Sequence, residues 1–245
     1  EAVLIPQSEQ ISYDIGSAST DHVTVKSDYV ETTLAAAAIS GATSITVASA
    51  TGIAASDKIA VVLDDGTVHF TTVNGAPAGA VITLLAGLAD SAASGMKVMA
   101  YTSALVRPIK IVAVRRKNLA SGYETNLTRL ERLDYQALAN KDSDGLPSQY
   151  YYDPQLALGK LYLYQRETAI SEIINFTCHR PIEDFDAAAD NPDLPQEWIK
   201  ALNYGLALDL GDSFDIPEQR YGRIAAQFAA TMSALAGHDR EEGSV

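Results

Sequence analysis

The sequence has only one cysteine and no long apolar run. The lack of a second cysteine and the lack of such a run each exclude some classes of protein. Cys178 has no second cysteine to pair with, which excludes an internal disulfide and fits folding in a reducing cytoplasm. No apolar run is long enough to span a bilayer, and the first residues lack the basic-then-apolar pattern of a secretion signal. Because the chain does not begin with Met, we expect either a processed N-terminus or a start inside a longer protein.

Motifs of the common enzyme classes are missing as well. The sequence contains no glycine-rich phosphate loop, nucleophile elbow, zinc-ligand cluster or dinucleotide fingerprint. Cys178 and His179 are neighbours on an expected strand, where successive side chains point to opposite faces, so a catalytic dyad is disfavoured. Asp64 and Asp65, close to His69 in sequence, are explained by a tight Asp-Gly hairpin turn without a metal. We therefore predict no cofactor, no metal site and no catalytic residues.

Positive charge is scarce and unevenly placed. The formal net charge is −13, from 18 basic and 31 acidic residues, which is opposite in sign to that of a general nucleic-acid binder. Seven basic and two acidic residues lie in 105–132, whereas six acidic residues and no basic one lie in 183–197. Opposite patches favour head-to-side association between copies, although two solvated faces that never meet explain the pattern equally well.

The composition changes near residue 32 and changes back near residue 100. Between these points the chain consists mainly of Ala, Thr, Ser, Val and Gly, with few charged residues. Short apolar runs recur about every ten residues with turn residues between them, which is typical of a small all-β barrel or sandwich. The flanking strands carry more charge, so residues 32–100 are predicted to be a β-module inserted into a second domain.

The second domain is expected to combine strands with helices. Residues 108–116 predict a strand with Ile109, Ile111 and Ala113 on one face. LDYQALANK predicts a short helix, and the tyrosine-rich stretch after it predicts half-buried strands in preference to a base-stacking surface. Residues 171–181 (SEIINFTCHRP) predict a further strand.

Two C-terminal helices are the clearest prediction. Apolar residues recur at steps of three and four from Trp198 to Leu210 and again from Tyr221 to Leu235. A proline opens each helix, and Gly211 and Gly237 are expected just after the two ends. The short connection between the helices predicts an antiparallel pair.

The predicted fold class is α+β: a C-terminal antiparallel helix pair packed with a β-strand core, plus the inserted small all-β module. Residues 1–31 and 101–245 are expected to form the core, and residues 32–100 the module. Residues 238–245 are expected to form a polar C-terminal tail with too little apolar content to fold alone.

Several segments, taken in order, match the pattern of a known family. They are SEQISYDIG, RPIKI, GLPSQYYYDPQLALGKLYLYQ and DNPDLPQEWIKALNYGLALDL, within residues 1–25 and 105–237. The matching positions are Tyr135, Gly145, Pro147, Tyr152, Pro154, Leu161, Tyr162, Pro195, Trp198, Ala201, Leu202 and Leu206. Together they resemble the head-to-tail adaptor proteins of short-tailed bacteriophages, also called tail accessory or tail tubular A-type proteins. The module at 32–100 departs from the pattern, as does the lack of a helical segment before the first strand.

The resemblance implies a structural virion protein and not an enzyme. Family members form rings of identical subunits, usually twelve-fold, between the portal protein at the capsid vertex and the tail nozzle. DNA passes through the ring without sequence-specific binding, and no membrane is involved. For this chain we expect interface residues in the basic patch, the acidic loop and the C-terminal tail: Arg107, Arg115, Arg116, Lys117, Asp184, Asp186, His238 and Arg240.

Two alternatives stay open. A tail-associated enzyme that degrades cell wall would use the carboxylates between Glu183 and Asp186 as acid and base. A binding protein would use the β-module at 32–100 to recognise a capsid or tail partner or a surface glycan.

Overall fold

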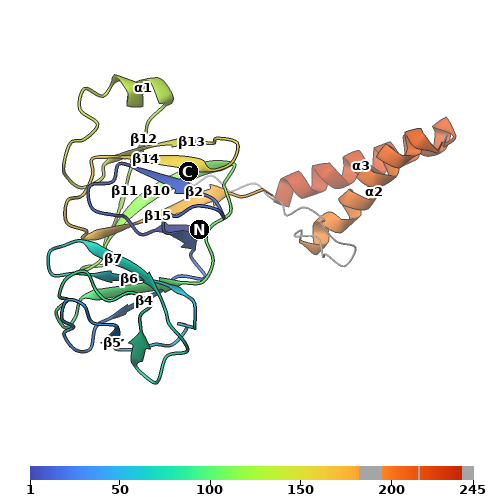
Figure 1. Cartoon of the computed structure of the whole chain (residues 1–245). Coiled ribbons are helices and arrows are strands. Elements are labelled where there is room, and N and C mark those ends of the chain that lie inside the picture. Colours follow the sequence, from blue (N-terminus) through green and yellow to red (C-terminus); the bar gives the residue numbers. More distant parts are fainter. Residues whose placement is uncertain (182–194, 215, 239–245) are drawn as a thin grey trace. The chain divides into compact units, whose positions relative to one another are not determined.

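A computed structural model describes residues 1–181, 195–214 and 216–238 of the chain (Figure 1). The fold is mixed α+β, as the sequence predicts, with several sheets and three helices among these residues. The chain divides into two compact units, Glu1–Pro181 and Ile182–Val245.

Two sheets of the first unit face each other as a sandwich. One has the strand order β11-β10-β15-β1-β3 and the other the order β12-β13-β14-β2. The strands are β1 (Ala2–Leu4), β2 (Ser12–Ile15), β3 (Val23–Val25), β10 (Lys110–Asn118), β11 (Glu124–Asn126), β12 (Thr128–Arg129), β13 (Gln149–Asp153), β14 (Gly159–Tyr164) and β15 (Glu172–His179). Leu4 and Phe176 of the first sheet share a buried core with Tyr13 and Leu161 of the second. The predicted short helix is α1 (Arg132–Ala137).

The chain between β3 and β10 forms a third layer. Its sheet has the order β4-β9-β6-β7, beside a two-stranded ribbon of β5 and β8. The strands are β4 (Val30–Thr33), β5 (Ser44–Thr46), β6 (Lys58–Val62), β7 (Val68–Thr72), β8 (Val81–Thr83) and β9 (Lys97–Tyr101). They enclose a separate core of aliphatic side chains, including Ile45, Ile59 and Leu88. The module boundaries at 32 and 100 stay a prediction, but the strands between them pair only with one another and with β4.

The module packs on the outer face of the five-stranded sheet (Figure 1). Val3 and Ile173 of that sheet share a buried cluster with Ala60, Val62 and Met99 of β6 and β9. Successive side chains of a strand point to opposite faces, so β1 buries one face in the sandwich core and the other against the module. All of β1 is accordingly buried.

The side chains of β10 do not face the core in the way predicted for residues 108–116. Its pairing with β15 shifts register between Ile111 and Ala113, which marks a β-bulge. Beyond the bulge the alternation is offset, so Ile111 and Val114 both face the sandwich core. Ile109, placed before the strand, is 54% exposed. The predicted face of Ile109, Ile111 and Ala113 is therefore wrong.

The second unit contains two helices, α2 (Gln196–Ser213) and α3 (Glu218–His238). A Cβ built on Gly205 would lie 3.3 Å from the ring of Phe228, and one built on Gly211 would lie 3.1 Å from the ring of Tyr221. Positions later in α2 thus face positions earlier in α3, so the pair is antiparallel, as predicted.

Both helices run past the glycines that were predicted to end them. Helix α2 continues through Gly211 to Ser213, and α3 includes Gly237 before its last residue. Gly211 lies inside the helix because its missing side chain leaves room for the Tyr221 ring. A tertiary contact therefore outweighs the local tendency of glycine to end a helix.

Candidate functional site

Several basic residues of the predicted interface already form ion pairs within the first unit. Arg115 Nη2 lies 2.7 Å from Glu1 Oε1, and its Nε donates to Glu124 Oε2 at 2.8 Å. Asn175 donates to the other oxygen of Glu124 at 2.8 Å. The hydrogen bond from Arg115 lowers the pKa of Glu1. Arg115 is thus held between two carboxylates of its own chain.

The next two basic residues are paired in the same way. Lys117 and Lys97 both donate to the carboxylate of Glu31, at 3.0 and 2.8 Å. Burial raises the pKa of Glu31, but these two hydrogen bonds outweigh it and the pKa is lowered overall. Arg116 lies 3.4 Å from the buried carboxylate of Glu172. A partner for Arg115, Arg116 or Lys117 would therefore have to compete with internal carboxylates.

Arg107 differs from these three basic residues. The other predicted interface residues lie at the ends of the described ranges or outside them. Among the described residues, Arg107 forms no ion pair. Asp184, Asp186 and Arg240 lie outside the described residues. His238 is the last residue of α3, and its side chain is not described.

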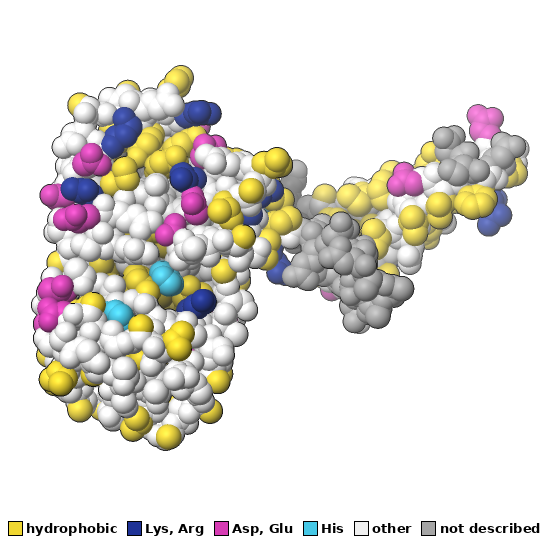
Figure 2. All heavy atoms as spheres, viewed as in Figure 1, with side chains coloured by type: hydrophobic (Ala, Val, Ile, Leu, Met, Phe, Trp, Pro, Cys, Tyr) yellow, Lys and Arg dark blue, Asp and Glu magenta, His cyan; other side chains and the backbone are white. Residues whose placement is uncertain are grey.

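The helix pair presents an apolar groove of about 380 Å³. It is lined by Trp198, Ala201, Leu202, Gly205, Leu206, Asp209, Phe228 and Met232. Leu206 and Leu210, on the predicted apolar face of α2, are 55% and 45% exposed, and Phe214 at its end is 74% exposed. Figure 2 shows hydrophobic side chains along the pair. Two helices give each apolar stripe one neighbour only, so this unit by itself leaves the stripes partly in water.

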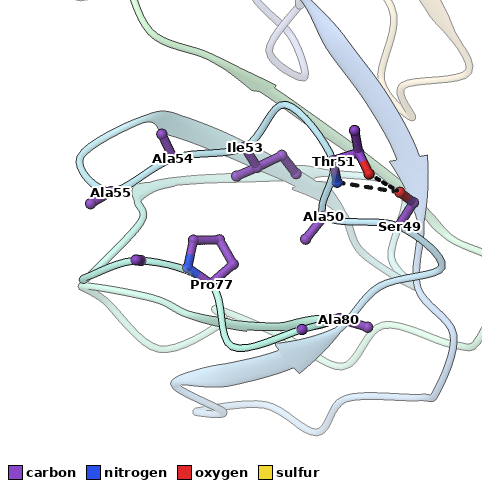
Figure 3. Close-up of a pocket in the computed structure, with 10 residues that line it drawn as sticks. Ser49, Ala50, Thr51, Ile53, Ala54, Ala55, Pro77 and Ala80 are labelled. Carbon is purple, nitrogen blue, oxygen red and sulfur yellow. Dashed lines mark hydrogen bonds between the residues drawn. The ribbon is translucent and has the colours of Figure 1, made fainter.

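The β-module carries a hollow of about 660 Å³ (Figure 3). It is lined by Ser49, Ala50, Thr51, Ile53, Ala54, Ala55, Ala76, Pro77, Gly79 and Ala80. Ser49 donates to the Thr51 hydroxyl at 3.1 Å and accepts from its backbone N–H at 3.2 Å. The lining has no ionisable side chain to activate these hydroxyls and no aromatic ring on which a sugar could stack.

A buried pair of carboxyl groups lies where the β14–β15 connection meets the module. Glu167 and Glu172 are each only 6% exposed. Glu167 Oε2 accepts from the Ser171 N–H at 3.0 Å, while its Oε1 has no hydrogen-bond partner among the described residues. Burial, with the nearby Glu172 charge, raises the pKa of Glu167 to about 7. Sequence reasoning missed this pair, because nothing in the pattern RETAISE distinguishes buried glutamates from surface ones.

Two of the residues weighed as metal or catalytic groups, Asp64 and Cys178, make contacts that support the fold. Asp64 accepts from the Ser91 hydroxyl and the Ala93 N–H, both at 2.8 Å, so it fastens the predicted hairpin to a neighbouring loop. Among the described residues, no three His, Cys, Asp or Glu side chains come together in a way that could hold a metal. Cys178 packs against the sandwich core, and burial raises the pKa of its thiol, whereas His179 is exposed.

Neither the hydropathy of the described helices nor a comparison with known proteins assigns a function. In the parts of the chain that are described, no helix is long and apolar enough to cross a membrane. No protein-family model, curated protein or solved structure matches the chain.

Proposed function

We propose that the protein is a structural, non-enzymatic component of a phage virion. In this proposal it is a head-to-tail adaptor that forms a ring, twelve-fold as in the family it resembles, between the portal protein and the tail nozzle. The ring lines the channel through which DNA leaves the capsid. The family pattern in residues 1–25 and 105–237 supports this, and so does one structural observation, the apolar surface of the helix pair.

The helix pair is built like a subunit of a larger bundle. Its apolar stripes are those that the sequence pattern marks for burial, yet Leu206 and Leu210 are about half exposed in this unit. Helices gain most of their stability from packing of such faces, so exposed stripes favour association. A contact between different surfaces of identical copies closes into a ring when the rotation fits. The expected packing of the helix pair with the strand core belongs to the same proposal.

The charge distribution supports passage of DNA without binding. Affinity for DNA comes mainly from Lys and Arg contacts to phosphate. This chain has a net charge of −13, and Arg115, Arg116 and Lys117 already lie against carboxylates. A channel wall of this composition would repel the phosphate backbone and let the DNA slide. The polar tail at 238–245 is assigned to the contact with the portal.

The test is the mass of the full chain, alone and mixed with its candidate portal, by mass photometry. We expect a closed ring in the presence of the portal. Leu206→Glu, which places a charge in the helix groove, should prevent that ring without unfolding the monomer, because the side chain is already 55% exposed. Leu133→Glu is the matched control, since Leu133 is 78% exposed on α1, and it should assemble normally. A chain that stays monomeric with every portal, or a normal ring from Leu206→Glu, contradicts the proposal.

Charge reversal of Arg115 or Arg116 would be a poor test of assembly. Either change would set a new carboxylate beside Glu1, Glu124 or Glu172 and weaken the fold of the monomer. The enzyme alternative depends on carboxylates between 183 and 186, which lie outside the described residues.

A further inference from the structure

One end of the sandwich exposes large apolar side chains next to two cations. Val106, Ile109 and Leu156 are 46%, 54% and 96% exposed. Arg107 is half-buried and Lys110 is exposed. We refer to these five residues as the basic–apolar strip. Scattered apolar residues are normal on a surface, but an apolar group edged by charge is typical of a contact surface.

Contacts of the backbone hold the strip together. Gly16 lies between Arg107 and the turn that follows β13: a Cβ built there would be 2.5 Å from Leu158 Cδ2 and 3.8 Å from Arg107 Cβ. The turn between β13 and β14, which carries the leucine of the strip, thus lies beside Arg107. On the other side, the Ile109 N–H donates to the His179 carbonyl at 2.7 Å. The strip therefore runs from this turn to the end of β15.

The two cations of the strip are available for a partner. Among the described residues, neither Arg107 nor Lys110 forms an ion pair, in contrast to Arg115, Arg116 and Lys117 further along the chain in β10. A binding segment should supply carboxylates for the cations and large apolar side chains for the surface between them.

We propose that the strip binds residues 182–186 of a neighbouring copy of the chain. Their sequence, Ile-Glu-Asp-Phe-Asp, alternates two large apolar side chains with three carboxylates, and it opens the stretch that has six acidic residues and no basic one. This complementarity of charge and apolar content selects the segment, and the proposed ring assigns it to a neighbouring copy. The inference rests on the proposed ring and adds to it the second contact between subunits. The strip and the segment are different surfaces of the same chain. Each copy can therefore bind one neighbour through its strip and another through its segment, as a closed ring requires.

The test uses full chains with reversed charges. The strip variant carries Arg107→Glu and Lys110→Glu, and the segment variant carries Glu183→Lys, Asp184→Lys and Asp186→Lys. In a ring of either variant alone, like charges would face each other at every contact. The apparent dissociation constant for assembly should therefore rise at least about tenfold. An equal mixture should assemble like the unchanged protein. In alternating rings, each acidic strip meets a basic segment, and each basic strip meets an acidic segment.

A control variant, Lys58→Glu with Arg129→Glu, changes the net charge as much as the strip variant does. Lys58 is exposed, and the ion pair that Arg129 forms with Glu131 lies on the surface, with the two side chains 49% and 73% exposed, so its loss should cost little. Both residues are away from the strip in sequence, and assembly should be unchanged. Circular dichroism should show that all variants are folded.

The outcomes separate the two proposals. If the unchanged protein never assembles, alone or with its portal, the ring itself is contradicted. If it assembles and the strip variant assembles equally well, only the strip contact is wrong. If mixing fails to restore assembly but all five changes in one chain restore it, the segment contacts the strip of its own chain, which also overturns the proposal.

Discussion

Replacement of Glu167 by glutamine should change how the stability of the first unit depends on pH. The Glu167 side chain belongs to the β14–β15 connection, whose backbone also binds the N-terminal segment through the Glu9 N–H at 2.8 Å. The same connection touches the module, because the Ile170 N–H donates to the Gly66 carbonyl at 2.7 Å. The buried carboxyl group thus lies at a joint between three parts of the unit. Glutamine has nearly the same shape and can keep the bond from the Ser171 N–H.

The size of the effect follows from the raised pKa. Burial raises the pKa of Glu167 to about 7 from its ordinary 4.5. Between these values the folded state holds a proton that the unfolded chain has lost, so the free energy of unfolding falls as pH rises from 4.5 to about 7. Each pKa unit corresponds to about 1.4 kcal/mol, so the whole shift corresponds to about 3 kcal/mol. Glutamine cannot titrate, so Glu167→Gln should match the unchanged protein at acid pH and exceed it by about 3 kcal/mol at alkaline pH.

The assay is urea unfolding at about pH 5 and about pH 8, followed by circular dichroism of the β-sheet. Tryptophan fluorescence is unsuitable, because Trp198 is the only tryptophan and lies in the helix pair. Glu131→Gln is the control, since the Glu131 side chain is 73% exposed and its loss should leave the pH dependence unchanged. Equal pH dependence in the unchanged protein and Glu167→Gln would refute the reasoning.

Two further changes test the joint between the module and the sandwich. Glu31→Gln removes a carboxylate whose pKa is lowered by its two lysine partners, so it should cost about 1–2 kcal/mol at neutral pH, with the difference vanishing as pH falls through the pKa of Glu31; urea titrations at several pH values measure this. Gly66→Ala should lower the free energy of unfolding by about 2 kcal/mol, because Gly66 has φ +83° and a Cβ there would lie 2.5 Å from Ala169 Cβ. Thermal unfolding of Gly66→Ala beside Gly75→Ala, a glycine with φ +81° and open space around it, separates the clash from the backbone strain.

Elements that depend on local signals could be predicted from the sequence. Periodic apolar residues and opening prolines identify α2 and α3, and the Asp-Gly turn identifies the hairpin of β6 and β7. The ends of the helices could not be predicted, because Gly211 stays helical through its contact with Tyr221 on the other helix. A glycine between apolar residues has the same local pattern whether or not a ring lies against it.

Features that depend on distant pairing could not be predicted. The bulge between Ile111 and Ala113 exists only in the pairing of β10 with β15, which comes much later in the chain. That bulge decides which side chains of β10 enter the core, so strict alternation from residue 109 gives the wrong face. The buried position of Glu167 likewise comes from the meeting of three segments that are far apart in sequence.

Which basic residues of the predicted interface are paired within the chain also could not be predicted from the sequence. Their ion pairs indicate which surface is better suited to assembly. A charge count treats Arg107 and Lys117 alike, although the fold sets Lys117 against Glu31. A partner that used the paired cations of β10 would have to displace Glu31 and the buried Glu172, and leaving a buried carboxylate without its partner costs several kcal/mol. A partner that used Arg107 and the apolar side chains beside it breaks no ion pair among the residues that the structure describes. Association between copies should therefore begin at the strip, where the cost of binding is lowest.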